Sequence, residues 1–160
     1  MTGEDSFWAF VGDSRMRQLY FEILKLVDPD AEPLAVATDS NGNSLDTLLI
    51  DEPFRVSAIM SEKELKQEDN TKPLKNAHKS LIYNNSQLSL RVMFFWRPMF
   101  NQTTADLIHQ LGLSRSVPHV VVAGSGSWNI KLSNGSQIIL DAYSENLQLL
   151  ARVSPKGSEK

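Results

Sequence analysis

The sequence contains no cysteine, and this absence excludes three kinds of chemistry. Without a thiol the chain can form no disulfide bond, no thiolate nucleophile and no cysteine-ligated metal centre. Long apolar runs are also missing. None approaches the roughly 20 residues that cross a bilayer, and the first residues lack the charged and apolar regions of a signal peptide. The lack of cysteine does not by itself decide the cellular compartment.

Basic charge is scarce as well, because 16 Lys and Arg stand against 19 Asp and Glu and give a net charge of −3. This balance offers no basic surface for a nucleic acid, so we expect no nucleic-acid partner. A chain of 160 residues with 41% hydrophobic content can bury one ordinary core. We therefore expect a single soluble domain.

What the sequence does contain is an apolar strand that runs into Gly12-Asp13-Ser14 and restarts at once as a helix. Apolar side chains then recur at steps of three and four residues, which is the helical period. They are Met16, Leu19, Tyr20, Ile23, Leu26 and Val27. The first N–H groups of a helix have no partner within it, so Ser14 is predicted to be a nucleophile beside donors for an oxyanion. The alternative is that Gly12 permits a tight turn, Asp13 or Ser14 caps the helix, and nothing reacts.

A second loop of small residues follows the β-branched run 118–124, which we expect to be a central strand. The loop reads Gly124-Ser125-Gly126-Ser127-Trp128-Asn129. In a right-handed open sheet it converges with the Ser14 loop, where its amides complete an oxyanion hole. Alternatively it is a glycine-rich turn into a helix, with Trp128 packing only. A phosphate cradle is less favoured, because neither G-x-G-x-x-G nor a Walker motif is present.

The remaining pattern predicts an open, mainly parallel α/β sheet with its site at the carboxyl ends of the strands. The expected segments are a polar loop 28–51, a short strand 54–59, a charged segment 61–75 whose helix ends near Asn70, hairpin arms 80–83 and 88–96, a helix from Thr103 or Thr104 to Gly112, and a helix 138–153. The second hairpin arm is almost continuously apolar, so we expect it deep in the sheet.

A serine nucleophile needs a base, and the sequence has only three histidines. We expect His78, in a polar stretch, to be solvated. His119 begins a strand whose other end carries the candidate loop, so it lies at the wrong edge of the sheet. His109 shares a helix face with Asp106, but the place of this pair inside the helix argues against a catalytic role.

The start Gly12-Asp13-Ser14-x-x-Arg17 resembles the first block of SGNH/GDSL hydrolase-like domains, in the PC-esterase branch that includes glycan O-acetyltransferases. Longer blocks in the same order resemble the luminal catalytic domains of Golgi sialic-acid O-acetyltransferases. These blocks are residues 10–19, Phe94-Phe95-Trp96-Arg97-Pro98, 118–124 and Trp128-Asn129-Ile130-Lys131. The resemblance runs from about Phe7 to Val153 and leaves 154–160 as a polar tail.

The resemblance implies a three-layer, flavodoxin-like fold and a Ser14 that takes an acetyl group from acetyl-CoA and passes it to a hydroxyl of CMP-activated sialic acid. It implies that Arg17 binds an anionic substrate group, although a solvated helix cation is the competing interpretation. The other residues expected at the oxyanion and substrate site are Gly12, Asp13, Gly124, Ser125 and Trp128. We expect no bound cofactor or metal. We expect a place in the Golgi lumen, within a membrane protein whose anchors are absent from this chain. Asn84, Asn101 and Asn134 stand in N-glycosylation acceptor triplets, a mild indication of a luminal chain.

The chain departs from the family pattern in two places. The family takes its catalytic Asp and His from an Asp-x-x-His motif after the last strand, and this chain stops before that strand. Gly126 and Ser127 occupy the Asn and Asp places of the GxND block if Gly124 is its glycine. We therefore expect the 160 residues alone to be a partial domain, essentially inactive, with an unpaired sheet edge. A carbohydrate esterase and a non-catalytic module that binds glycans or a partner remain the alternatives.

Overall fold

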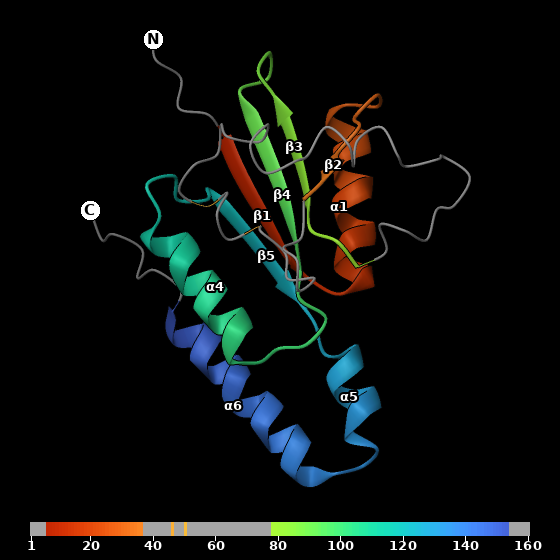
Figure 1. Ribbon diagram of the computed structural model, residues 1–160, viewed down its shortest axis with the longest axis vertical. Helices are drawn as coiled ribbons and strands as arrows, with labels where there is room; N and C mark the ends of the chain where they lie inside the picture. Colours follow the sequence, from red (N-terminus) through yellow and green to blue (C-terminus); the bar gives the residue numbers. More distant parts are fainter. Residues whose placement is uncertain (1–5, 37–45, 47–49, 51–77, 154–160) are drawn as a thin grey trace.

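The computed structural model describes residues 6–36, 46, 50 and 78–153, which form an open five-stranded sheet with helices on both faces (Figure 1). The strands are β1 (Ser6–Gly12), β2 (Leu34–Ala35), β3 (Leu81–Asn85), β4 (Leu90–Trp96) and β5 (Val120–Gly124). The helices are α1 (Ser14–Val27), α4 (Gln102–Leu113), α5 (Ser127–Ser133) and α6 (Gln137–Val153). The predicted α/β class is confirmed.

The order across the sheet is β2-β3-β4-β1-β5. Strand β1 lies parallel to β4 on one side and to β5 on the other. Strand β3 runs antiparallel to β4 and β2 antiparallel to β3, so the hairpin 80–96 is confirmed. The parallel core is therefore β4-β1-β5, and its three strands end at the same edge of the sheet.

Two hydrophobic clusters show why the sheet carries helices on both faces. Successive strand residues point to opposite sides. Phe10 and Phe94 pack with Tyr20 and Leu24 under α1. The residues next to those phenylalanines pack with Leu107 and Leu111 under α4. Each fully buried Leu or Phe contributes about 1.5–3 kcal/mol through apolar burial, so the two clusters hold the layers together.

The arrangement corrects several expectations about the helices. In α1 the inward face includes Leu24, which is 1% exposed, whereas Leu26 is 86% and Leu19 41% exposed. The step from Tyr20 to Leu24 is one helical turn, so Leu24 and not Leu26 follows it on the buried face.

The caps of α4 also differ from expectation. Asn101, not Thr103 or Thr104, is the N-cap, and its side chain accepts a hydrogen bond from the amide of Thr104. Helix α4 runs through Gly112 to Leu113 instead of ending at the glycine. Helix α5 was expected only in the alternative interpretation of the second loop as a turn into a helix, because its seven residues are too few for a helical period to stand out.

Strand β5 was expected to be central, but within the part of the chain described here it lies at the edge and pairs with β1 alone. Val120 and Val121 are each 43% exposed for this reason. Strand 88–96, by contrast, is central as predicted, since β4 lies between β3 and β1.

Several expected segments fall outside the described residues. They are the strand 54–59, the charged segment 61–75, most of the loop 28–51 and the tail 154–160. Of that loop, the described part holds the short strand β2. Among the described helices, none combines the length and the apolar character needed to cross a bilayer.

Candidate active site

Three strand ends meet at the site. In the register of the sheet Gly12 pairs with Trp96 of β4 on one side and with Gly124 of β5 on the other. A Cβ at Gly12 would stand 2.0 Å from the Gly124 carbonyl oxygen and 2.5 Å from Met16 Cγ. The site therefore needs a glycine here, because the two backbones and the first turn of α1 approach too closely for a side chain.

Ser14 is the first residue of α1 and is exposed. Asp13 before it is 3% exposed and caps the helix, accepting a hydrogen bond from the Arg15 amide at 2.9 Å. The Asp13 carbonyl oxygen also accepts a hydrogen bond from the Arg17 amide at 3.0 Å. The alternative interpretation is thus right about the cap, which is Asp13. Ser14 itself stands at the helix N-terminus, exposed to solvent.

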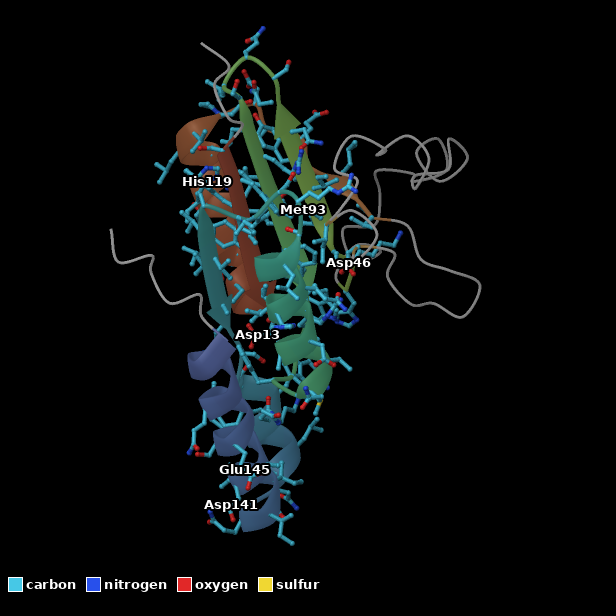
Figure 2. All side chains as sticks on the ribbon, turned by 90° about the vertical axis from the view of Figure 1, so that its left-hand side faces the viewer. Asp13, Asp46, Met93, His119, Asp141 and Glu145 are labelled. Atoms are coloured by element: carbon cyan, nitrogen blue, oxygen red, sulfur yellow. The ribbon has the colours of Figure 1, made fainter. Side chains whose placement is uncertain are left out.

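The two predicted loops come together. Ser127, the first residue of α5, donates its hydroxyl to the second carboxylate oxygen of Asp13 at 2.5 Å. Figure 2 shows Asp13 where the sheet meets the α5 and α6 layer, and His119 at the opposite end of the sheet. The Asp13 carboxylate therefore ties the loop after β1 to the loop after β5.

The second loop is held by neighbours on both sides. The Ser125 hydroxyl donates to the Pro98 carbonyl at 2.6 Å, and the Tyr143 hydroxyl of α6 donates to the Ser125 carbonyl at 2.9 Å. A Cβ at Gly126, where φ is +146°, would stand 2.6 Å from that same Tyr143 hydroxyl. Both the backbone conformation and the space at this position require glycine.

The last three residues of the loop lie in α5, so the interpretation as a turn into a helix is correct about the local structure. Trp128 is half-buried, with the Lys131 ammonium 5.3 Å from its ring centre. Asn129 is 4% exposed and its amide oxygen accepts the Phe100 amide at 3.1 Å. Asn129 thus fastens α5 to the segment after β4. A substrate contact of Trp128 stays a prediction.

A groove of about 880 Å³ begins at Ser14 and follows α1. Its charged lining is mixed, with three basic and two acidic side chains. They are Arg15, Arg17, Lys25, Glu22 and Glu32. A volume of this size suits a small-molecule ligand. Ser14 and Arg17 both line this groove, and their roles as nucleophile and substrate-binding cation stay predictions.

Trp96 is a site residue that the strand and helix patterns did not single out. It ends β4 beside Gly12, and the Arg17 guanidinium carbon lies 5.7 Å from its ring centre. The exposed His78 stacks on the same indole, with ring centres 4.8 Å apart and planes 25° apart. His78 is solvent-exposed as predicted, but it also packs on an aromatic ring. The signal available was a large aromatic at the carboxyl end of a buried strand.

Arg97, which is partly exposed, and Asp46, which is buried, form an ion pair behind the site. The two guanidinium nitrogens of Arg97 lie 3.1 and 3.0 Å from the two carboxylate oxygens of Asp46, whose side chain is fully buried. Ser80 donates its hydroxyl to Asp46 and accepts the Trp96 amide at 2.9 Å. The Arg97 amide donates to the Gly12 carbonyl at 2.9 Å. This network fixes the end of β4 against the end of β1.

Two of the three histidines lie away from Ser14. His119 accepts the Phe7 amide through Nδ1 at 3.1 Å and so aligns the starts of β1 and β5, at the wrong edge as expected. His109 is exposed on α4, and it is Gln102 that donates to Asp106, at 2.8 Å. Within the described residues no cluster of three or more acidic or histidine side chains is arranged to hold a metal ion.

The three glycosylation acceptors are all exposed. Asn84 lies in β3, and its side-chain oxygen accepts a hydrogen bond from Arg91 Nε at 3.3 Å. Asn101 is the N-cap of α4. Asn134 caps the end of α5 in the left-handed conformation. Modification of any of them stays a prediction.

A curated protein of zebrafish (Danio rerio), named N-acetylneuraminate (7)9-O-acetyltransferase, is 27% identical to this chain over 155 residues. The aligned region takes in 94% of this chain and 14% of the zebrafish protein. The chain therefore spans less than two thirds of that relative's length. The similarity confirms the resemblance to sialic-acid O-acetyltransferase domains. No family model matches the chain, and no solved structure matches it.

Proposed function

We propose that this chain is the serine-bearing part of an O-acetyltransferase domain that acts on a hydroxyl of sialic acid or CMP-sialic acid. The observation that carries the proposal is the exposed Ser14 at the N-terminus of α1, in a groove it shares with Arg17. The similarity to a protein named N-acetylneuraminate (7)9-O-acetyltransferase supplies the substrate class. Acetyl-CoA is the acetyl donor in this proposal, and no bound cofactor takes part.

The reaction has two acyl transfers. In the first, Ser14 Oγ attacks the thioester carbonyl, the C–S bond breaks, and the thiol leaves with the proton that the serine gives up. In the second, a sugar hydroxyl attacks the serine ester, the new ester forms, and the proton returns to Ser14. The Ser14 amide and the amides of the loop Gly124 to Gly126 stabilise the oxyanion in both.

We propose that the general base comes from outside the described residues. His119 is engaged with the Phe7 amide, and His109 is on the outer side of α4. The His78 ring is stacked on Trp96. The base of the resembled family stands in an Asp-x-x-His motif, and we propose that a longer form of the protein carries it. Loss of such a base costs on the order of 10⁶ in kcat, while oxyanion donors alone retain about 10³ to 10⁴ over water. The 160 residues alone are therefore essentially inactive.

Hydrolysis of sugar esters is the second candidate function. It uses the same serine and differs in whether water or a sugar hydroxyl attacks the acyl-enzyme. The exposure of Ser14 favours it, because water reaches the hydroxyl when no acceptor fills the groove.

The exposed N-glycosylation triplets at Asn84, Asn101 and Asn134 support a luminal place for the domain, which we propose is the Golgi.

A fluorophosphonate probe tests the proposal, because it phosphonylates activated serines. We expect slow labelling of the 160-residue chain, located at Ser14 by mass spectrometry and accelerated by added imidazole as a substitute base. Ser14→Ala abolishes the label, and Ser86→Ala in the exposed β3–β4 turn keeps it. Equal labelling of Ser14→Ala and the natural chain, or no label even with imidazole, contradicts a nucleophilic Ser14 and favours the non-catalytic module.

A further inference from the structure

We infer that Trp96, Arg17 and His78 form a subsite for the carboxylate of an acidic sugar, next to Ser14. The inference rests on the proposed function, since it assumes that the sugar reacts at Ser14. It adds two residues, Trp96 and His78, for which the acyl-transfer chemistry itself has no use.

The three side chains come to the α1 face of the sheet from three different segments. Trp96 ends the central strand β4 and packs against the cluster under α1. Arg17 is one turn into α1, in the groove that begins at Ser14. His78 precedes β3 and stacks on the indole. The subsite is therefore built at the carboxyl edge of the sheet, where α/β proteins bind their ligands.

Two basic groups contact the Trp96 indole. The Arg17 guanidinium lies 5.7 Å from its centre, within the range of a cation–π contact. The His78 ring lies 4.8 Å from it and nearly parallel. Stacking restricts both side chains before the ligand arrives, which lowers the entropy lost on binding.

The surroundings favour a carboxylate over a phosphate. The helix N-terminus, the usual phosphate site, is already capped by the Asp13 carboxylate at the Arg15 amide. That carboxylate adds negative charge beside the site, which disfavours a doubly charged ligand. A planar guanidinium with one imidazole suits a planar, singly charged group, and Arg binds carboxylates through two parallel hydrogen bonds.

The indole N–H signals in a ¹⁵N–¹H spectrum provide the test, because the chain has three tryptophans and Trp96→Phe assigns the one in question. The probes are N-acetylneuraminate, its methyl ester and CMP, which separate the carboxylate from the ring and from the nucleotide phosphate. We expect N-acetylneuraminate to shift the Trp96 indole saturably. The methyl ester should bind about tenfold more weakly, as expected for loss of a charged hydrogen bond, and CMP alone should leave the signal in place.

Variants locate the contact. We expect His78→Gln, at an exposed position that folding tolerates, to weaken the binding of N-acetylneuraminate about tenfold. Arg17→Ala should weaken that binding at least as much. Arg115→Ala and His109→Gln, exposed residues of the same types away from the groove, should leave the affinity unchanged. Equal binding of acid and ester, a Trp96 shift with CMP alone, or His78→Gln binding like the natural chain would overturn the subsite.

The outcome is separable from that of the proposed function. Binding of a carboxylate does not need the serine, so Ser14→Ala should titrate like the natural chain. Carboxylate binding without probe labelling of Ser14 would support the subsite and contradict the proposed enzymatic function. Labelling of Ser14 without carboxylate binding would contradict the subsite and support the enzymatic function.

Discussion

Gly12 lies where three pieces of backbone crowd one another, and a single methyl group there tests the geometry of the site. The added Cβ would meet the Gly124 carbonyl oxygen at 2.0 Å, a contact that rigid backbone cannot relieve by changing a rotamer. We expect Gly12→Ala to lower the free energy of unfolding by about 2–3 kcal/mol, as overpacking of a rigid core does. Urea denaturation followed by circular dichroism measures the change.

Gly112 provides the matched control. It lies in α4 with no atom within 4 Å of the place of its Cβ. Gly112→Ala should raise stability by about 0.5–1 kcal/mol, because alanine favours the helix. A Gly12→Ala protein as stable as the natural chain would show that β1 and β5 are farther apart at their ends than described.

The buried hydroxyl of Tyr20 lowers the stability of the fold, so removing it should have a stabilising effect. Its side chain is fully buried between Phe10 and Phe94, and its hydroxyl has no hydrogen-bond partner among the described residues. Burial accordingly raises the pKa of the phenol far above its usual value. We expect Tyr20→Phe to keep the aromatic packing and to raise the unfolding free energy by about 1 kcal/mol, since it removes an unpaired polar group. A loss of stability in the same urea experiment would mean that the hydroxyl is paired.

At the scale of elements, the Arg97–Asp46 pair connects the end of β4 to a residue 51 positions away. Removing one partner of a buried ion pair leaves the other charged and desolvated. We expect Arg97→Ala to cost about 3–5 kcal/mol in urea denaturation. Glu22→Ala, which breaks the exposed Lys25–Glu22 pair on α1, should cost less than about 0.5 kcal/mol. Equal costs for the two variants would contradict the buried network.

The end of α1 is joined to β3 through a carboxylate. The Tyr83 hydroxyl donates to Asp28, as does the Asn85 amide at 3.2 Å. The hydrogen bond from Tyr83 is the main reason that the pKa of Asp28 lies below its usual value. A carboxylate with a lowered folded pKa stabilises the fold above its unfolded pKa of about 3.9 and loses that contribution as the pH falls.

Removing the Tyr83 hydroxyl should therefore change how stability depends on pH. Tyr83→Phe should reduce stability near pH 6 and flatten the decline in stability below about pH 4, because the folded-state pKa of Asp28 then lies closer to its unfolded value. Denaturation midpoints between pH 6 and 3 measure this. Parallel declines in the variant and the natural chain would rule out the contribution of Asp28.

The sequence predicted those elements whose signal is local. The apolar run before Gly12 and the helical period after it defined β1 and α1, and the apolar arm 88–96 defined the central β4. Partners distant in the sequence could not be predicted. Nothing near Arg97 indicates Asp46, and nothing in the polar stretch around His78 indicates that its ring stacks on Trp96. The edge position of β5 was missed because a run of β-branched residues is typical of buried strands, whatever lies beside them.

For the candidate site, too, the sequence predicted the position of the two loops but not the contacts between distant side chains. Convergence of the two loops followed from the rule that parallel strands end at one edge, and the Asp13–Ser127 hydrogen bond confirms it. The roles of Ser14, Arg17 and the amides of the second loop stay predictions. Trp128 was expected at the site from the family resemblance, with packing as the alternative, and its ring contact with Lys131 shows that it does pack locally.

For the whole molecule, the open edge of the sheet has the largest consequence. Within the described residues β5 pairs with β1 alone, and Val120 and Val121 are exposed. An apolar edge strand is a template for pairing with another chain. We expect the 160-residue chain to self-associate in sedimentation velocity experiments and Val121→Lys to shift it towards monomer.

A control separates edge pairing from general stickiness. Leu26 is more exposed than either valine but lies on α1, away from the edge. Leu26→Lys should leave the association unchanged. If both variants reduce association equally, exposed apolar area and not the β5 edge drives it.

The most direct test of the central claim uses the absence of cysteine, because Ser14→Cys introduces the only thiol in the chain. If the N-terminus of α1 and the neighbouring Arg17 stabilise negative charge at this position, the thiol has a lowered pKa. The pH dependence of its alkylation by iodoacetamide gives that pKa, with Ser86→Cys in the exposed β3–β4 turn as the reference. The account predicts a pKa at least about one unit below the ordinary 8.5 for Ser14→Cys and an ordinary value for Ser86→Cys. A thiol at position 14 with a pKa equal to or above the reference would contradict it.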